Sequence, residues 1–182
     1  MGIKDIRLLL TDVDGILTNG KLYLSDTEEW IQFDIQDGIG HRLAACGGLT
    51  VGWLSGRVSK PVAYRAKHLK VPYLMQGKLD KIVAAEKLCE KLDLKLSEVA
   101  YMGDDIIDIP LLQAAGFSAT VPYGRVEVKK AANYVTEVQA GDGAFREVVE
   151  KILKAQGKWT MAVEKFNQIN REHAETSNDV FT

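Results

Sequence analysis

Short apolar segments alternate with segments of helical periodicity along most of the chain, and this alternation limits the possible folds more than any other feature. Helical spacing of apolar residues predicts helices at residues 41–46, 59–69, 81–92, 109–115, 126–132 and 144–155. The apolar runs between them predict strands at residues 6–10, 49–54, 71–74, 99–102, 117–121 and 134–138. Strands that alternate with helices form parallel sheets, so we expect an α/β, Rossmann-like sheet with helices on both faces.

Two segments depart from this alternation. Residues 21–34 place apolar side chains on both sides of a turn-like run, Ser25 to Glu28, which predicts a β-hairpin projecting from the sheet. After residue 158 a single apolar stripe predicts a short helix, followed by a polar end. We therefore expect one domain over residues 1–158, with the hairpin at about 21–34, and a C-terminal tail over residues 159–182.

The composition is that of an ordinary globular protein. The 182 residues are 46% hydrophobic and 26% charged, and the formal net charge is -2, which disfavours nucleic acid or an anionic membrane as a partner. No apolar run has the length of a membrane span, and the chain opens on a strand-like segment rather than a signal peptide. Cys46 and Cys89 lie far apart and indicate two buried thiols. We expect a cytoplasmic protein that binds neither nucleic acid nor membrane.

Acidic residues follow two of the predicted strands directly. Asp12 and Asp14 come after the run at residues 6–10, at a place where open α/β sheets bind ligands. Two carboxylates one residue apart can divide labour, because one can attack a substrate while the other transfers protons. The alternative is a turn that ends a strand, in which Asp and Gly are common.

A second acidic cluster, Asp104, Asp105 and Asp108, follows the strand at residues 99–102. Carboxylates are the ligands that Mg²⁺ prefers, and these acids would repel one another without a cation. They could instead cap the next helix, and capping is compatible with metal binding.

Two further polar segments follow strands. Ser55, Gly56 and Arg57 offer a hydroxyl and backbone N–H groups at a strand-to-helix turn, an arrangement suited to phosphate. Lys81 follows the strand at residues 71–74 and could neutralise phosphoryl oxygens and a nucleophilic carboxylate. Taken alone, the first segment is more typical of a turn with a surface arginine, and the lysine of a solvated helix start.

The order of these groups along the chain is acid pair, serine, lysine, acid cluster, and it closely resembles the four motifs of the haloacid dehalogenase superfamily. The resemblance spans residues 6–154. It implies that Asp12 is the nucleophile and a Mg²⁺ ligand. It also implies that Asp14 is the general acid/base and binds the metal through its backbone carbonyl, that Ser55 and Lys81 hold the phosphoryl group, and that Asp104 is a second ligand. Asp105 and Asp108 would orient metal-bound waters or Lys81.

The intervals at residues 15–54 and 56–80 are too short for the cap domain that usually encloses the site in this superfamily. The capless layout resembles 3-deoxy-D-manno-octulosonate 8-phosphate phosphatases. The motifs that carry this resemblance are F-D-I-Q-D-G-x-G, S-G-R, Y-L-M-Q-G-x-x-x-K, A-Y-M-G-D-D and G-x-G-A-x-R-E-V-V-E. That family implies a homotetramer with a hairpin-built barrel, a site closed by an adjacent subunit, and a role in lipopolysaccharide sugar biosynthesis.

The same resemblance implies a set of residues near the substrate. The set is Asp14, Asp34, Ile35, Gln36, Asp37, Gly38, Arg42, Gly56, Arg57, Arg65 and Lys81. Arginines of this set could pair with a sugar-acid carboxylate, although Arg42 and Arg65 could also be surface residues of helices. Departures from the family pattern are Ser rather than Thr at position 55, Gln36 where a basic residue is common, and the extension after Trp159.

Two other functions stay open at this point. Relatives that act on nine-carbon, sialic-type 9-phosphates tend to carry Glu at position 57, so Arg57 favours the eight-carbon substrate. A catalytically silent phosphate-binding domain, such as a phosphoreceiver domain, also uses acids, Ser or Thr, and Lys. A receiver has its lysine last, whereas here Lys81 precedes the Asp104 cluster. A silent homologue would be expected to have lost Asp12, Asp14 or Lys81, and all three are present.

Overall fold

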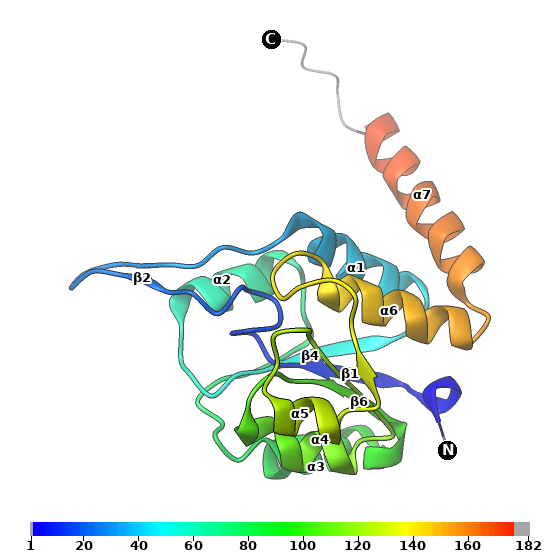
Figure 1. Cartoon of the computed structure of the whole chain (residues 1–182). Helices are drawn as coiled ribbons and strands as arrows, with labels where there is room; N and C mark the ends of the chain where they lie inside the picture. The colour runs from blue at the N-terminus through cyan, green and yellow to red at the C-terminus, as the bar shows by residue number, and fades with distance from the viewer. Residues whose placement is uncertain (1, 177–182) are drawn as a thin grey trace.

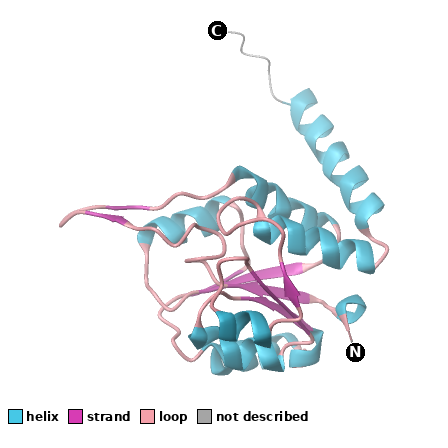
Figure 2. Cartoon of the chain, viewed as in Figure 1, coloured by secondary structure: helices cyan, strands magenta, loops and turns pink. Residues whose placement is uncertain are grey.

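The computed structural model describes residues 2–176 of the chain and shows a parallel sheet between two layers of helices (Figure 1; Figure 2). The sheet has the strand order β5-β4-β1-β6-β7-β8, and all neighbouring strands are parallel. The strands are β1 (Leu8–Thr11), β4 (Thr50–Leu54), β5 (Tyr73–Met75), β6 (Val99–Met102), β7 (Phe117–Thr120) and β8 (Tyr134–Val135). The predicted α/β architecture is confirmed.

Helices cover both faces of the sheet. The helices α1 (Ile35–Cys46), α2 (Lys60–His68) and α6 (Ala144–Ala155) cover one face, and α3 (Lys81–Leu92), α4 (Ile109–Ala114) and α5 (Val126–Ala131) cover the other (Figure 1). Within the strands, alternate side chains point to opposite faces. In β1, for example, Leu9 belongs to the core beneath α1 and α6, and Leu8 and Leu10 belong to the core beneath α3 and α4.

Helix α1 begins at Ile35, so the predicted start at residue 41 was wrong. Asp34 caps the helix, because its Oδ1 accepts a hydrogen bond from the Gln36 N–H. Gly38 and Gly40 interrupt the apolar pattern in the first turns and conceal the helix in the sequence. A Cβ on Gly40 would lie 3.0 Å from the Cα of Arg146, so the glycine permits α1 and α6 to approach closely.

The segment at residues 21–34 forms a hairpin that projects from the body (Figure 1; Figure 2). Its paired part is short: β2 (Tyr23–Leu24) is antiparallel to β3 (Glu29–Trp30), and Ser25 Oγ accepts hydrogen bonds from the N–H groups of Thr27 and Glu28 in the turn. Large apolar side chains of the hairpin are exposed. They are Leu22, Tyr23, Leu24 and Trp30.

The extension after residue 158 is the helix α7 (Trp159–Thr176), which is longer than the short helix predicted there. Its apolar stripe packs against the core beneath α1 and α6, and its later turns extend away from the body (Figure 1). The stripe consists of Trp159, Ala162, Val163, Phe166 and Ile169. Residues 177–182 of the predicted tail lie outside the described residues. No described helix is long and apolar enough to span a bilayer.

A buried histidine joins α1 to the sheet and to α6. The Nε2 of His41 accepts a hydrogen bond from Trp53 Nε1–H at 2.7 Å, because an indole nitrogen can only donate. The His41 Nδ1–H therefore donates to the Asp37 carbonyl oxygen at 2.7 Å, and the ring stacks on Phe145 with centroids 4.2 Å apart. Burial lowers the pKa of His41 to about 4.

We expect His41 to make the fold sensitive to mild acid. Its pKa is about 4 in the folded chain, against an ordinary value of 6.5 for a solvated histidine, so between these values the unfolded chain binds a proton that the folded chain does not. Stability is therefore lost as the pH falls from about 6.5 to about 4, and the His41 contribution is about 3 kcal/mol at about 1.4 kcal/mol per pKa unit.

The measurement is urea denaturation of the wild type and His41→Gln at several pH values from 7.5 to 4.5. Asp37 acts in the opposite direction, because burial raises its pKa to about 7, so the His41 contribution is taken from the difference between the two proteins. The advantage of the wild type should shrink as the pH falls. A difference that stays constant over this range would contradict the prediction.

Candidate active site

The acidic motifs meet at the carboxyl edge of the sheet, beside a crevice lined by Gly15, Asp104 and Asp105 among others. Asp12 follows β1 and Asp104 follows β6, and these two strands are neighbours in which Thr11 pairs with Met102. The chain leaves β1 toward β4 on one side and leaves β6 toward β7 on the other. Open α/β sheets bind ligands at such a change of direction.

Asp12 is almost completely buried, and hydrogen bonds fix both of its carboxylate oxygens. Oδ1 accepts from the Val13 N–H at 2.6 Å, and Oδ2 accepts from Lys81 Nζ at 2.5 Å. Lys81 is the first residue of α3, whose N-terminus is capped by Asp80. Its ammonium group also donates to Asp108 Oδ1 at 2.6 Å, so one buried cation lies between two carboxylates.

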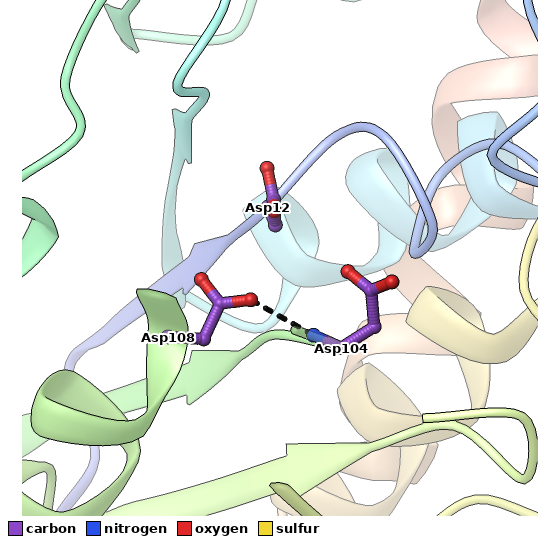
Figure 3. A group of neighbouring side chains, drawn as sticks. All are labelled: Asp12, Asp104 and Asp108. Carbon is purple, nitrogen blue, oxygen red and sulfur yellow. Dashed lines mark hydrogen bonds between the residues drawn. The ribbon is translucent and has the colours of Figure 1, made fainter. Parts of the chain in front are cut away.

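Asp108 fixes the loop that follows β6. Its Oδ1 also accepts from the Tyr101 hydroxyl at 2.5 Å, and its Oδ2 accepts from the backbone N–H groups of Asp104 and Asp105 at 3.0 Å each. Figure 3 shows the bond to the Asp104 N–H and the three neighbouring carboxylates. With four hydrogen bonds accepted, Asp108 holds Lys81 and the loop in place and has little capacity left to bind a metal.

Asp104 differs from Asp108 because no described residue donates a hydrogen bond to its carboxylate. Burial and the charges of Asp12 and Asp108 raise the pKa of Asp104 to about 7. Burial also raises the pKa of Asp12 to about 6, with Lys81 acting against it and Asp108 with it. Oxygen atoms of these three acids lie within 4.8 Å of one another, and Lys81 offsets only part of their charge. The residues therefore fit a hard divalent cation bound by Asp12 and Asp104.

The backbone of Gly15 approaches this cation site closely. Gly15 has φ +87°, in the left-handed region, and a Cβ at this position would lie 2.2 Å from Asp104 Oδ2. Only glycine combines this conformation with this approach. Asp105 lies at the edge of the cluster, where its Oδ1 accepts a hydrogen bond from the Ile106 N–H at 2.7 Å.

The Asp14 side chain lies on the hairpin side of the crevice, where it pairs with Arg57. Arg57 Nε donates to Asp14 Oδ2 at 3.0 Å, and Arg57 Nη2 donates to Asp14 Oδ1 at 3.4 Å. The same Nη2 donates to Glu29 Oε1, on the hairpin, at 2.7 Å. Glu29 was not among the predicted site residues, and nothing in the sequence pattern distinguishes it from the acid beside it.

Ser55 shapes the turn after β4. Its buried Oγ accepts from the Arg57 N–H at 3.1 Å, and the hydroxyl lies 3.2 Å from the Arg57 carbonyl oxygen, to which it donates. Gly56, between them, is half-buried, and a Cβ there would lie 3.3 Å from Leu79. The turn therefore presents Arg57 toward Asp14 while Ser55 stays close to the sheet.

Other predicted substrate residues gather at the start of α1. Asp37 is buried, with Oδ1 accepting from the Arg146 N–H at 3.0 Å and Oδ2 without a partner among the described residues. Arg65 Nη2 donates to the Asp34 carbonyl oxygen at 3.4 Å and lies 3.0 Å from the position of a Cβ on Gly38.

The remaining members of the predicted substrate set face elsewhere. Ile35 is 75% exposed, and Gln36 bonds to the Arg146 side chain. Arg42 contacts α7: its Nη2 donates to Asn170 Oδ1 at 2.5 Å, and its guanidinium lies 4.6 Å from the centroid of the Phe166 ring. The described contacts of Arg42 are thus with the C-terminal helix and not with the other predicted site residues.

A cavity of about 800 Å³ lies between the hairpin and α2. Arg57 and Arg65 line it together with Glu29 and the aromatic residues Trp30 and Phe33. Since Arg57 also contacts Asp14, the cavity adjoins the acidic crevice. A substrate with one anionic end at the crevice could extend its other end into this cavity.

The model of the haloacid dehalogenase-like hydrolases matches residues 54–148, which include Ser55, Lys81 and Asp104. The chain belongs to this family. Asp12 and Asp14 precede the matched segment, but the sheet brings them to the same crevice as the matched residues.

Relatives of this hydrolase match most of the chain. The 3-deoxy-D-manno-octulosonate 8-phosphate phosphatase of Escherichia coli K12 is 40% identical over 156 residues, which are 85% of this chain and 83% of the relative. The corresponding Moraxella catarrhalis enzyme, solved with a magnesium ion, a phosphate ion and a KDO molecule, has a TM-score of 0.87. It is 39% identical, over 90% of this chain and 95% of its own. The cobalt-bound Haemophilus influenzae phosphatase has a TM-score of 0.85 at 34% identity, over 91% and 98% of the two chains.

Proposed function

We propose that this hydrolase converts 3-deoxy-D-manno-octulosonate 8-phosphate to the free sugar acid and inorganic phosphate, a step in lipopolysaccharide sugar biosynthesis. The observation that carries the proposal is the group at the crevice formed by buried Asp12 and Lys81 with half-buried Asp104, in a chain 40% identical to an E. coli phosphatase of that substrate over 85% of its length. A silent domain of the receiver type also places a lysine among acids, but its lysine comes last in the chain, whereas here Lys81 precedes Asp104.

In the proposed mechanism Asp12 is the nucleophile. A carboxylate oxygen of Asp12 attacks phosphorus in line, and the bond from phosphorus to the C8 oxygen breaks as the new bond forms. Asp14 gives its proton to the departing oxygen and then takes a proton from the water that attacks the aspartyl phosphate. Lys81 and Ser55 hold the phosphoryl oxygens. Inorganic phosphate leaves and the Asp12 carboxylate is restored.

Mg²⁺ is the proposed cofactor, held by Asp12, the backbone carbonyl of Asp14 and Asp104, and it would supply positive charge opposite the substrate phosphate. Asp108 and Asp105 then act from outside this set. Asp108 contributes through Lys81 and the loop N–H groups, which supports a positioning role rather than a ligand role. The magnesium ion in the M. catarrhalis structure supports the choice of metal.

For the sugar acid we propose that Arg57 pairs with the carboxylate. Its Nε and Nη2 are engaged by Asp14 and Glu29, whereas its Nη1 has no partner among the described residues. Arg65, the segment Asp34 to Gly38, and Gly56 are proposed to line the rest of the substrate site. Arg42 is proposed to take part only where its contacts with α7 are released.

We propose that the chain forms a homotetramer through the hairpin, with each site closed by an adjacent subunit. Tyr23, Leu24 and Trp30 are 59%, 67% and 66% exposed in the single chain, which is costly for side chains of this size. Light scattering tests this proposal, and a monomer at working concentration would end it.

We also propose residues 1–158 as the phosphatase domain and 159–182 as its tail. A cytoplasmic location is proposed because Cys46 and Cys89 are free, buried thiols.

The test of the proposed function is Mg²⁺-dependent phosphate release from the eight-carbon 8-phosphate and the nine-carbon, sialic-type 9-phosphates, measured side by side. A preference for the eight-carbon substrate is expected. Preference for a nine-carbon substrate would keep the mechanism and overturn the role given to Arg57. No release from either substrate would overturn the proposal.

A further inference from the structure

Glu29 lies on the projecting hairpin, yet both of its carboxylate oxygens are bound to the body of the protein. Oε1 accepts from Arg57 Nη2 at 2.7 Å, and Oε2 accepts from the Ser59 hydroxyl at 2.9 Å. Ser59 is buried and caps α2 by accepting a hydrogen bond from the Val62 N–H. The start of α2 therefore fixes the Glu29 carboxylate, whose side chain is only 19% exposed.

Arg57 lies between Glu29 and Asp14, so the three side chains form one line from the hairpin to the crevice. The Arg57 side chain is 38% exposed. Holding a long, partly exposed side chain in one orientation costs conformational entropy. A second carboxylate that accepts from the same Nη2 as Asp14 lowers the number of orientations open to the guanidinium.

We infer that Glu29 is a positioning residue that holds the Arg57 guanidinium against Asp14, so that the hairpin controls the orientation of the general acid/base. The inference rests on the proposed function for the role of Asp14. It adds a contribution from the hairpin to the reaction within one chain, besides the contribution to assembly proposed above. Whatever moves the hairpin should then change proton transfer at Asp14.

Hydrogen bonds favour the charged forms of Glu29 and Arg57. Burial acts to raise the pKa of Glu29, but the hydrogen bonds from Arg57 and Ser59 outweigh it and lower the pKa. The hydrogen bond to Asp14 raises the pKa of Arg57 against the effect of burial. The side chain of the neighbouring Glu28 accepts a hydrogen bond from Trp30 Nε1–H, at 3.2 Å, and from no other described residue. Glu28 therefore offers a matched control on the same hairpin.

The experiment is a double-mutant cycle on the magnesium-loaded, full-length protein. It compares kcat/KM of the wild type, Glu29→Gln, Arg57→Ala and the double variant. Because a positioned general acid contributes about 10²–10⁴-fold, we expect Glu29→Gln alone to lower kcat/KM about 10-fold and Arg57→Ala about 100-fold. If Glu29 acts through Arg57, the double variant should lie within about 2-fold of Arg57→Ala.

Effects of the two substitutions that multiply in the double variant would overturn the inference, as would a Glu29→Gln protein as active as the wild type. Glu28→Gln should match the wild type, and thermal unfolding should show Glu29→Gln to be folded, since the amide keeps the shape of the side chain. Glu29→Asp keeps the charge but shortens the reach, and it should show an intermediate loss, which a purely electrostatic role would not produce.

The substrates separate this inference from the proposed function. The cycle is measured with the eight-carbon 8-phosphate, a nine-carbon 9-phosphate and ribose 5-phosphate, all of which have alkyl leaving groups that need a proton. The protein could hydrolyse another alkyl phosphate but not the eight-carbon substrate. Non-additive effects of the Glu29 and Arg57 substitutions would then support the positioning role of Glu29 and overturn the proposed substrate. A wild type that hydrolyses none of them would overturn both.

Discussion

Replacing Lys81 by methionine is expected to lower the free energy of unfolding by about 3–5 kcal/mol and to lower phosphate release by about 100-fold or more. The Lys81 side chain is fully buried, and its ammonium group contacts Asp12 and Asp108, of which Asp108 is also fully buried. Burial acts to lower the pKa of Lys81, but the two carboxylates outweigh it, and the pKa is raised. Methionine fills similar space and leaves the two acids facing each other without a cation.

The measurement is urea denaturation with and without MgCl₂, together with phosphate release. Lys78→Met is the matched control, because Lys78 is an exposed lysine of the same segment that forms no ion pair with a described residue, and its substitution should cost less than about 0.5 kcal/mol. Since a divalent cation on Asp12 and Asp104 offsets part of the same repulsion, Mg²⁺ should restore some stability to Lys81→Met. A stability loss below about 1 kcal/mol would show that the lysine is not needed to bury these acids.

The sheet and most helices follow from the sequence because burial on both faces leaves a strong apolar signal. The predicted bounds of β6, α3 and α6 agree with the structure. The start of α1 could not be predicted from an apolar signal. Gly38 and Gly40 leave room there for Arg65 and α6, which approach the helix closely. In a single sequence such glycines indicate a loop.

The centre of the candidate site was predictable for a related reason. Parallel strands end at one edge, so residues that follow β1, β5 and β6 had to come close to one another, and the structure brings Asp12, Lys81 and Asp104 together. The contacts that lead away from this centre were not predictable. The bond from Glu29 to Arg57 depends on how the hairpin lies against α2, and the bond from Arg42 to Asn170 depends on the path of α7. Neither path is encoded in local periodicity.

Replacing Asp12 by asparagine is expected to reduce turnover by about 10⁴-fold or more, as removal of a nucleophile does in other covalent mechanisms. Asparagine keeps the shape of the side chain, and its amide oxygen can still accept the Val13 N–H bond. Lys81 also keeps its bond to Asp108. The fold should therefore persist, which thermal unfolding checks, and the loss can be assigned to chemistry.

Loss of turnover alone does not separate a nucleophile from a metal ligand, because Asp12 is proposed to be both. The separation comes from Asp14→Asn, a matched change at the other acid of the pair. This variant keeps the nucleophile but should not activate water, so phosphate from a substrate with a good leaving group, such as p-nitrophenyl phosphate, should accumulate on the protein. Mass spectrometry of the acid-quenched variant should locate that phosphate on Asp12, and Asp12→Asn should carry none. Phosphate on another residue, or on Asp12→Asn, would refute an aspartyl phosphate at Asp12, and metal binding would then be the only role left for its carboxylate.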